Sequence, residues 1–409
     1  KFKKTCLLGS IYIYWFSLAK FQSRDMRSPK VMRTNPNMSS FDVSLPTLPF
    51  DLISEIVSRL PVKSLLQFRC VSKSWKSLIS DPIFARKHLN LSTTRRLLCL
   101  SYDKHSHRFF LNSYSLQSIF RDTDYNITRL EYPSDNICKG SLSHYAVGSC
   151  DGILCVATCR FFLDFKPLVV LWNPSIRKFK ELPPFENPPG LDRLYMSYGF
   201  GYDHASHDYK VVVIYNLLGI NGGIVWDTTK AKVYTLSTDS WRTIQPFPFD
   251  SVSSYQQGRY VSGSINWLAY SKGTHQRCII SFDLGHETYQ MIRMPLGLER
   301  TPKDPVFSVL RDWLCLIFDH DVWVMKEYGV KESWTKLFNV THLLDPPFKS
   351  FVLTNVLYIF QDDQLLLLFR KDCERRFILY NFKNDTSKVS FMLKDFPQLC
   401  VESLISPCS

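Results

Sequence analysis

Residues 48–61 of the chain read LPFDLISEIVSRLP. The apolar side chains of this stretch recur at the spacing of one helical turn and form a continuous stripe, which consists of Leu52, Ile53, Ile56, Val57 and Leu60. Pro49 suits the first turn of a helix, and the Asp51 carboxylate complements the positive end of the helix dipole. Because Pro61 disfavours a helical conformation in the residue before it, we expect an amphipathic helix that ends at Leu60.

Further short helices follow. The apolar positions of a second helix over residues 62–68 and of a third helix after it are Leu65, Leu66, Phe68, Val71, Trp75, Leu78 and Ile79. Asp81 and Pro82 are a helix cap and a helix-starting proline. A module of roughly 45 residues buries at most about 60% of its unfolded surface. We therefore expect part of the apolar stripe to bind a partner. The alternative is that the helices pack on the rest of the chain as ordinary core.

Residues 52–65, LISEIVSRLPVKSL, and 68–79, FRCVSKSWKSLI, resemble the F-box of plant F-box proteins in order, spacing and residue identity. F-box modules dock on the Skp adaptor of cullin-based ubiquitin ligases. The resemblance therefore implies a Skp-type adaptor and, through it, a cullin as partners. It assigns the adaptor-binding surface to Leu48, Pro49, Leu52, Ile56, Leu60, Pro61, Leu65, Val71 and Trp75.

Beyond residue 91 the pattern changes to short apolar runs separated by turn residues. The runs that we expect to be strands are residues 96–102, 152–158, 168–172, 210–215, 232–236, 279–282, 314–318, 322–325, 365–369 and 377–380. Several are continuously apolar, as in strands covered on both faces. The content of 30 Phe, 20 Tyr and 9 Trp also favours β structure.

A weak repeat runs through these strands: an apolar strand with an aromatic residue, a polar turn, then a second strand. Its aromatic anchors are Trp172, Tyr234, Phe282, Trp323 and Tyr380, about 50 residues apart. This spacing favours a degenerate β-propeller, whose small sheets bury their faces on one another. A flat β-sandwich is the alternative. The fold class we expect is a multidomain α+β chain, with a small N-terminal helical module and a mostly β domain.

Three further segments carry a second resemblance. They read VGSCDGILC at 147–155, LWNP at 171–174 and YGFGYD at 198–203. Together they resemble the F-box-associated, kelch-like domain of plant F-box proteins. The resemblance implies a domain for recognising a protein substrate. We expect an N-terminal extension over 1–41, the F-box over 42–92 and the F-box-associated domain over 93–400.

Two long connections stand out as substrate-binding candidates, because rigid β scaffolds display binding residues on loops. Residues 183–191 contain four prolines, and residues 216–226 are unusually apolar for a loop. The candidate residues are Phe185, Leu191, Leu217, Ile220 and Trp226. The alternative is that both connections only pack across the end of the propeller.

Charge and cysteine content exclude several classes of protein. Of the formal net charge of +13, the first 40 residues carry +7, and no run of five basic residues marks a nucleic-acid-binding arm. The 12 cysteines are scattered, often in apolar runs, and have no zinc-site spacing. We expect free thiols, no metal, no cofactor and a cytoplasmic or nuclear location.

The N-terminal residues 6–19 are apolar and follow a pair of lysines, as in a signal sequence. Fourteen residues are too few to span a bilayer, and no clear cleavage site follows. Met26, Met32 and Met38 could each be the start of the protein. We expect residues 1–41 to be disordered or extraneous, and we expect no binding to membranes.

The sequence offers no catalytic constellation. The nearest acidic pairs, Asp203 with Asp208 and Asp362 with Asp363, lie in polar turns, where we expect solvated carboxylates. We therefore expect a non-catalytic adaptor that links a protein substrate to a ubiquitin ligase. The alternative is a propeller enzyme or a carbohydrate-binding module that uses the helices only as a brace.

Overall fold

The computed structural model describes residues 49–103, 105–106, 108–116, 119, 127–132, 143–159, 168–185, 194–218, 224–249, 251–252, 256–271, 276–295, 297–299, 301, 304–340, 351–360, 364–371, 374–393 and 397–408. They divide into two compact units. The helical unit extends to Thr94 and includes the C-terminal residues Glu402–Ile405. The β unit holds Arg95–Val401 and the residues after Ile405.

The described part of the helical unit contains four helices: α2 (Phe50–Val57), α3 (Val62–Phe68), α4 (Lys73–Ser80) and α5 (Pro82–Leu91). The three predicted helices and the predicted helix start at Pro82 are confirmed. Helix α2 ends at Val57, three residues before the predicted end. The backbone N–H of Leu60 donates a hydrogen bond to the carbonyl of Val57, three residues earlier. The chain therefore forms a 3-10-type turn between the end of α2 and Pro61.

Side-chain caps fix the starts of the last two helices. The hydroxyl of Ser72 accepts a hydrogen bond from the backbone N–H of Trp75 at 3.3 Å. The Asp81 carboxylate accepts from the N–H groups of Ile83 and Phe84 at 2.6 and 3.3 Å. Each cap satisfies amide groups that have no partner within the helix. The predicted cap at Asp81 is therefore confirmed.

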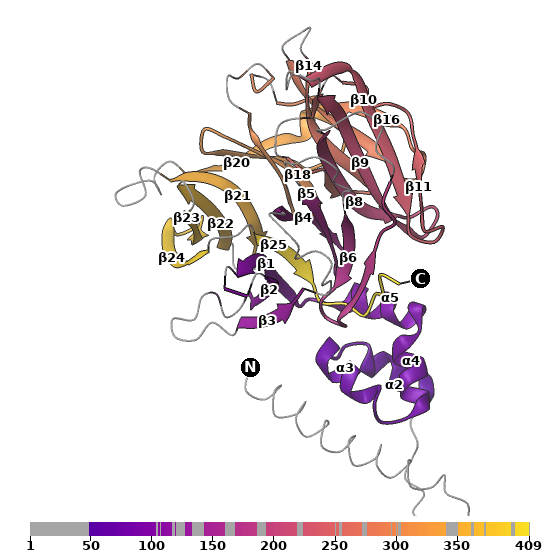
Figure 1. The fold of residues 1–409 in the computed structure, drawn as a ribbon. Coiled ribbons are helices and arrows are strands. Elements are labelled where there is room, and N and C mark those ends of the chain that lie inside the picture. The colour runs from indigo at the N-terminus through magenta and orange to yellow at the C-terminus, as the bar shows by residue number, and fades with distance from the viewer. Residues whose placement is uncertain are drawn as a thin grey trace, which may run out of the picture. The chain divides into compact units, whose positions relative to one another are not determined.

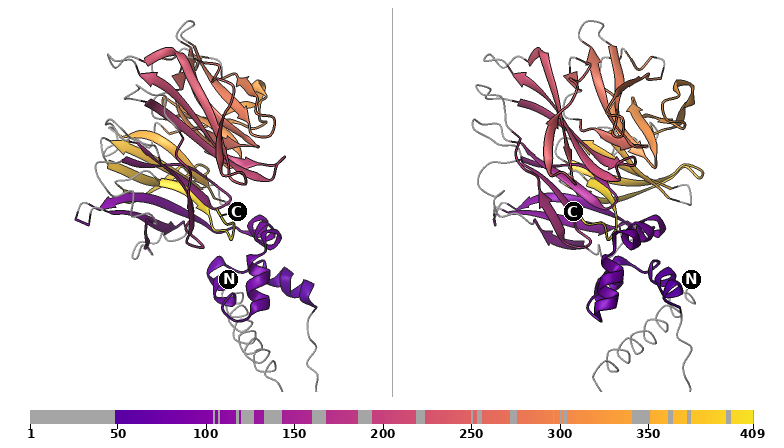
Figure 2. Two further views of the ribbon diagram at one scale, coloured as in Figure 1. Left: turned by 45° about the vertical axis from the view of Figure 1, so that its right-hand side comes forward. Right: turned by 90° about the vertical axis from the view of Figure 1, so that its right-hand side faces the viewer.

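Six antiparallel sheets make up the β unit and form a six-bladed β-propeller (Figures 1 and 2). Their strands are β1 (Arg95–Asp103), β2 (Arg108–Ser115), β3 (Ile127–Glu131), β4 (Ser143–Cys150), β5 (Ile153–Cys159), β6 (Val169–Asn173), β7 (Lys178–Glu181), β8 (Leu194–Asp203), β9 (Asp208–Leu218), β10 (Ile224–Thr235), β11 (Ser240–Thr243), β12 (Ser251–Val252), β13 (Arg259–Val261), β14 (Ser264–Ser271), β15 (Gln276–Asp283), β16 (Tyr289–Ile292), β17 (Val306–Leu310), β18 (Trp313–Phe318), β19 (Asp321–Met325), β20 (Trp334–Asn339), β21 (Val352–Ile359), β22 (Gln364–Lys371), β23 (Glu374–Asn381), β24 (Thr386–Leu393) and β25 (Pro397–Val401), with a 3-10 turn at Lys331–Ser333.

Five sheets take consecutive strands: β4–β7, β8–β11, β12–β16, β17–β20 and β21–β24. The sixth sheet is ordered β25-β1-β2-β3, so the last strand of the chain pairs with the first. Its register runs antiparallel from Arg95 opposite Val401 to Cys99 opposite Pro397. This pairing closes the ring of blades, because the last strand of the chain completes the sheet that the first strands form.

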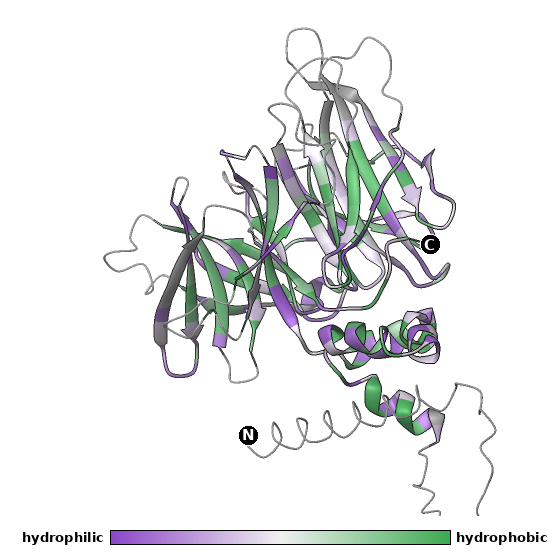
Figure 3. Ribbon diagram, turned by 60° about the horizontal axis from the view of Figure 1, so that its bottom comes forward, coloured by the Kyte–Doolittle hydropathy of each residue, from purple (hydrophilic) through white to green (hydrophobic). Residues whose placement is uncertain are grey.

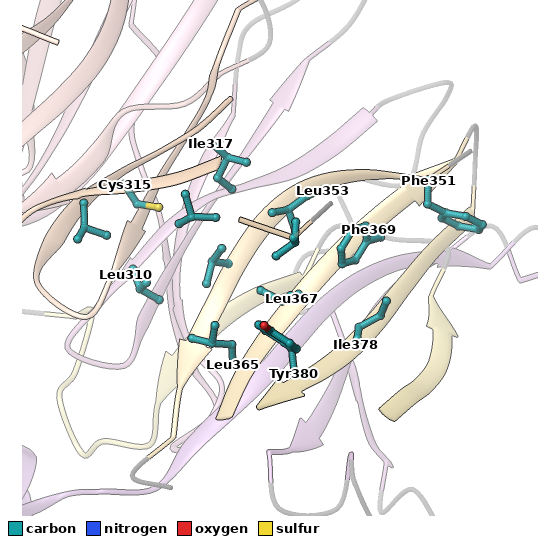
Figure 4. Close-up of a cluster of buried hydrophobic side chains, with 14 residues drawn as sticks. Leu310, Cys315, Ile317, Phe351, Leu353, Leu365, Leu367, Phe369, Ile378 and Tyr380 are labelled. Atoms are coloured by element: carbon teal, nitrogen blue, oxygen red, sulfur yellow. The ribbon is translucent and has the colours of Figure 1, made fainter. Parts of the chain in front are cut away.

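The propeller core lies between neighbouring sheets. One cluster joins the sheet β17–β20 to the sheet β21–β24 and is drawn in Figure 4. Leu310 and Cys315 from the first of these sheets lie in this cluster with Leu365 and Phe369 from the second, and all four are fully buried. Strand β6 is buried at every position. The apolar runs of the sequence are therefore strands covered on both faces, as predicted.

The five aromatic anchors occupy equivalent positions. Trp172, Tyr234, Phe282, Trp323 and Tyr380 each lie on the second-last strand of their sheet, namely β6, β10, β15, β19 and β23. In the first three of these sheets the residue opposite on the last strand is also aromatic. The propeller prediction is confirmed, and the sandwich alternative is wrong.

A shared turn follows four of these anchors. The residue five positions after the anchor has a positive φ of about 50°, at Arg177, Asp239, Glu287 and Asp385. Asp283, directly after its anchor, accepts hydrogen bonds from the next backbone N–H groups at 2.9 and 2.6 Å, and Asn173 and Asn381 do the same. These side chains fold the polar turn that joins the last two strands of each sheet.

Candidate partner-binding surfaces

Helix α2 exposes part of its apolar stripe. Leu52 and Ile56, one helical turn apart, are 51% and 42% exposed, whereas Val57 on the inner side is buried. Figure 3 shows the mixed hydrophobic and hydrophilic residues of these helices. Two large aliphatic side chains that stay in water on one helix face are typical of a docking surface.

An ion cluster flanks this stripe. The Glu55 carboxylate lies 2.6 Å from Lys87 Nζ of α5 and 2.8 Å from Arg59. The hydrogen bond from Lys87, with the one from Arg59, lowers the pKa of Glu55 below its usual value. The cluster ties α2 to α5 with the carboxylate ionised at neutral pH, and it leaves Leu52 and Ile56 uncovered.

The other predicted adaptor residues differ in exposure. Pro49 and Pro61 are exposed, and Leu60, Val71 and Trp75 are partly buried. Leu65 has no exposed surface, so its prediction as a surface contact is wrong: its side chain belongs to the core of the helical unit. Leu48 lies outside the described residues.

Trp75 has a structural contact that the sequence did not indicate. Its ring centroid lies 5.5 Å from that of the buried Phe68, in a tilted arrangement. Part of the Trp75 side chain therefore packs inside the unit while part remains exposed. A variant that removes this ring changes the fold of the unit as well as its surface.

His88 was missed by the sequence analysis. It is 3% exposed, and its Nε2 lies 2.9 Å from the carbonyl oxygen of Leu60. The imidazole thus holds α5 against the corner between α2 and α3. Leu60 lies between these two helices, so its carbonyl is available for a hydrogen bond to a side chain. No periodic pattern marks a contact between residues 28 positions apart.

Phe185, the first substrate-binding candidate, is 5% exposed. Its ring stacks on Tyr215 at 6.1 Å and meets Trp241 edge-on at 5.1 Å. Trp241 Nε1 also donates to the carbonyl of Pro183 at 2.7 Å. The prediction of Phe185 as an accessible anchor is therefore wrong, because the ring fills the space between two neighbouring sheets.

The second connection is shorter than expected. Strand β9 extends to Leu218 and β10 starts at Ile224, so Leu217 and Trp226 lie in strands. Leu217 is paired with Leu194, the first residue of β8. Leu191 and Ile220 lie outside the described residues.

The comparisons with known proteins match both units. Residues 45–87 match the F-box domain, and residues 103–407 match the F-box associated beta propeller domain. The chain belongs to the F-box proteins with an associated propeller. Relatives of this F-box protein include F-box/kelch-repeat protein At3g23880 of Arabidopsis thaliana, 31% identical over 73% of this chain and 80% of the relative. F-box protein CPR1 of the same plant is 29% identical over 88% of this chain and 89% of its own length.

Among solved structures, this F-box protein is similar to a post-proline cleaving enzyme from Rickettsia typhi, with a TM-score of 0.40 and 11% identity. That similarity covers 84% of this chain and 50% of the other. So distant a similarity says nothing about activity.

One acidic pair of this F-box protein is not solvated as predicted. Asp203 and Asp208 are 2% and 8% exposed. Asp203 Oδ2 lies 2.8 Å from Lys210 Nζ, and Asp208 Oδ2 accepts from the Ser237 N–H at 2.9 Å. The prediction of solvated carboxylates is wrong here, because both carboxylates are buried and bonded to other groups of the protein. Asp362 and Asp363 lie outside the described residues.

Lys210 connects two blades of this F-box protein. Its Nζ donates to the Leu284 carbonyl at 2.6 Å and lies 3.1 Å from Glu287 Oε1, which also contacts Arg242. All hydrogen-bonding capacity of the ammonium is used by Asp203, Leu284 and Glu287. The cluster is thus an ion-paired joint between the sheet β8–β11 and the sheet β12–β16.

Within the described ranges, no group of three or more potential metal ligands comes together, and no helix is long and apolar enough to cross a membrane. Eight cysteines are described with their side chains, and none of these eight forms a disulfide bond. Burial raises the pKa of the Cys278 and Cys315 thiols to about 12, and it raises that of Cys155 further still. These side chains serve the propeller as small apolar groups.

Proposed function

We propose that this F-box protein is the substrate-recognition subunit of a Skp-cullin-F-box ubiquitin ligase. In this role the helical unit holds the chain on a Skp-type adaptor and, through it, a cullin. The propeller holds a protein substrate near the ubiquitin-charged enzyme. The protein itself carries out no chemistry, and transfer is accelerated because the reacting groups are kept close together.

The exposure of Leu52 and Ile56 carries this proposal. Burying an aliphatic side chain completely stabilises a complex by about 1.5–3 kcal/mol, so covering the half that remains exposed contributes about 1 kcal/mol from each. The F-box match supplies the class of partner that would cover them. A propeller with short, well-paired strands supplies a rigid support for substrate-binding connections.

We further propose a cytoplasmic or nuclear location. Cys155 and Cys315 are completely buried thiols within strands, where they pack as apolar side chains. Free thiols in this number suit a reducing compartment.

Reconstitution tests the proposal. The full chain is mixed with a purified Skp-type adaptor and a cullin, and the mixture is separated by size-exclusion chromatography. We expect the three proteins to elute together, and we expect affinity capture with ubiquitin transfer blocked to retain a substrate. A folded chain that elutes apart from every adaptor tried would contradict the proposal.

A further inference from the structure

The C-terminal residues Glu402–Ile405 belong to the helical unit, although they follow the last strand of the propeller directly. Val401 pairs with Arg95 in the ladder between β25 and β1. One residue further on, the Glu402 N–H donates to the Thr94 carbonyl at 2.9 Å. The two segments that join the units are therefore hydrogen-bonded to each other at the boundary.

Beyond this bond the tail is held and buried. Ser92, which ends α5, donates its hydroxyl to the Glu402 carbonyl at 3.1 Å. Ser403 has no exposed surface, and Leu404 and Ile405 are each 7% exposed. Since a helical unit of this size cannot build a large core from its own residues, four C-terminal residues that belong to the same compact unit are a substantial addition to it.

The tail can reach this position only after the propeller has closed. Glu402 follows Val401, the last residue of β25, directly. The pairing of β25 with β1 therefore determines where the tail begins. The helical unit comes first in the chain, yet its last four residues come more than 300 positions later. A chain whose propeller is open therefore lacks part of the helical unit.

We propose that Glu402–Ile405 act as a strap that makes the stability of the helical unit depend on closure of the propeller. Local stability differs between the parts of a protein and follows the contacts that each part makes. An incomplete or unclosed chain would present a loosened helical unit. This inference goes beyond the proposed function, because it concerns the folding of the unit whatever partner the unit binds.

Hydrogen–deuterium exchange of the full chain without any partner tests the strap. The double variant Leu404→Ala/Ile405→Ala removes the buried side chains and keeps β25. We expect amide exchange over α5, residues 84–89, to become at least about tenfold faster. Exchange in β14 and β15, in the sheet β12–β16, should change by less than about twofold.

Two further variants keep the outcome interpretable. Cys408→Ser alters an exposed tail residue outside the helical unit and should leave exchange in α5 unchanged. Ser92→Ala removes the hydrogen bond to Glu402 from the helix side and should accelerate exchange in α5 to a smaller extent. Unchanged α5 exchange in the double variant would overturn the proposal. Equal acceleration in α5 and in β14–β15 would also overturn it, because the tail would then act on the whole chain.

Discussion

Lys210 Nζ lies 2.8 Å from Asp203 Oδ2, and the two side chains are only 7% and 3% exposed. Burial alone raises the pKa of Asp203, but hydrogen bonds from Lys210, Ser206 and the Ala205 N–H outweigh it and hold the pKa at about 2. The Asp203 carboxylate is therefore ionised over the whole physiological range. Its ion pair with Lys210 is part of the joint between two propeller blades.

The first prediction concerns the pH dependence of stability. Because the pKa of Asp203 is lower in the folded than in the unfolded chain, the pair contributes stability above about pH 4, and the contribution is lost as the pH falls toward 2. The expected size is about 2–3 kcal/mol. Urea unfolding of the wild type and of Asp203→Asn across this pH range measures it. An equal pH dependence in both proteins would contradict the assignment.

The second prediction concerns the partner of this carboxylate. Lys210→Met leaves Asp203 buried without its cation, which should lower the free energy of unfolding by about 3–5 kcal/mol. The double variant Lys210→Met/Asp203→Asn removes both charges and should recover part of that loss. Denaturant unfolding of the three proteins tests this. If Lys210→Met were as stable as the wild type, the ion pair would make no contribution of this size to the free energy of unfolding.

The third prediction concerns Phe185. Because its ring is enclosed by Tyr215 and Trp241, Phe185→Ser should destabilise the propeller by about 3 kcal/mol. The control Phe179→Ser changes a ring that is 37% exposed and should cost less than about 1 kcal/mol. Thermal unfolding measures both. If Phe185→Ser melted like the wild type while substrate capture fell, the original assignment of Phe185 to substrate binding would have to be restored.

The fourth prediction is that all 12 thiols are free in the native protein. Alkylation of the denatured, unreduced chain followed by mass analysis decides it, and any specific disulfide would contradict it. In the native protein the exposed Cys70 and Cys408 should react quickly. Cys278 and Cys315 should react slowly, because burial keeps them protonated.

The parts of the fold that depend on local pattern were predictable from the sequence. Helix α3 spans the predicted residues 62–68, and all five aromatic anchors lie on the second-last strand of their sheet. The helix follows from the spacing of apolar residues within one helix, and the anchors follow from a repeat of the length of one blade. A single sequence contains both patterns.

The errors concern contacts between distant residues. Lys210, the partner of Asp203, also pairs with Glu287, 77 positions away, and Ser92 bonds to Glu402 across 310 positions. Leu65 and Leu52 lie on the same predicted module, yet only packing decides that the first is core and the second is surface. Periodicity identifies an apolar face and does not say what covers it.

The affinity of the full chain for a purified Skp-type adaptor tests the central claim most directly. Leu52→Asp places a carboxylate in the proposed apolar interface, which costs several kcal/mol, and we expect Kd to rise at least about 100-fold. Ile83→Asp makes the same change at an 81% exposed position of α5, outside the proposed surface, and should change Kd by less than about threefold. Both variants should melt close to the wild type, because neither side chain is buried. A Leu52→Asp chain that binds the adaptor as tightly as the wild type would contradict the account.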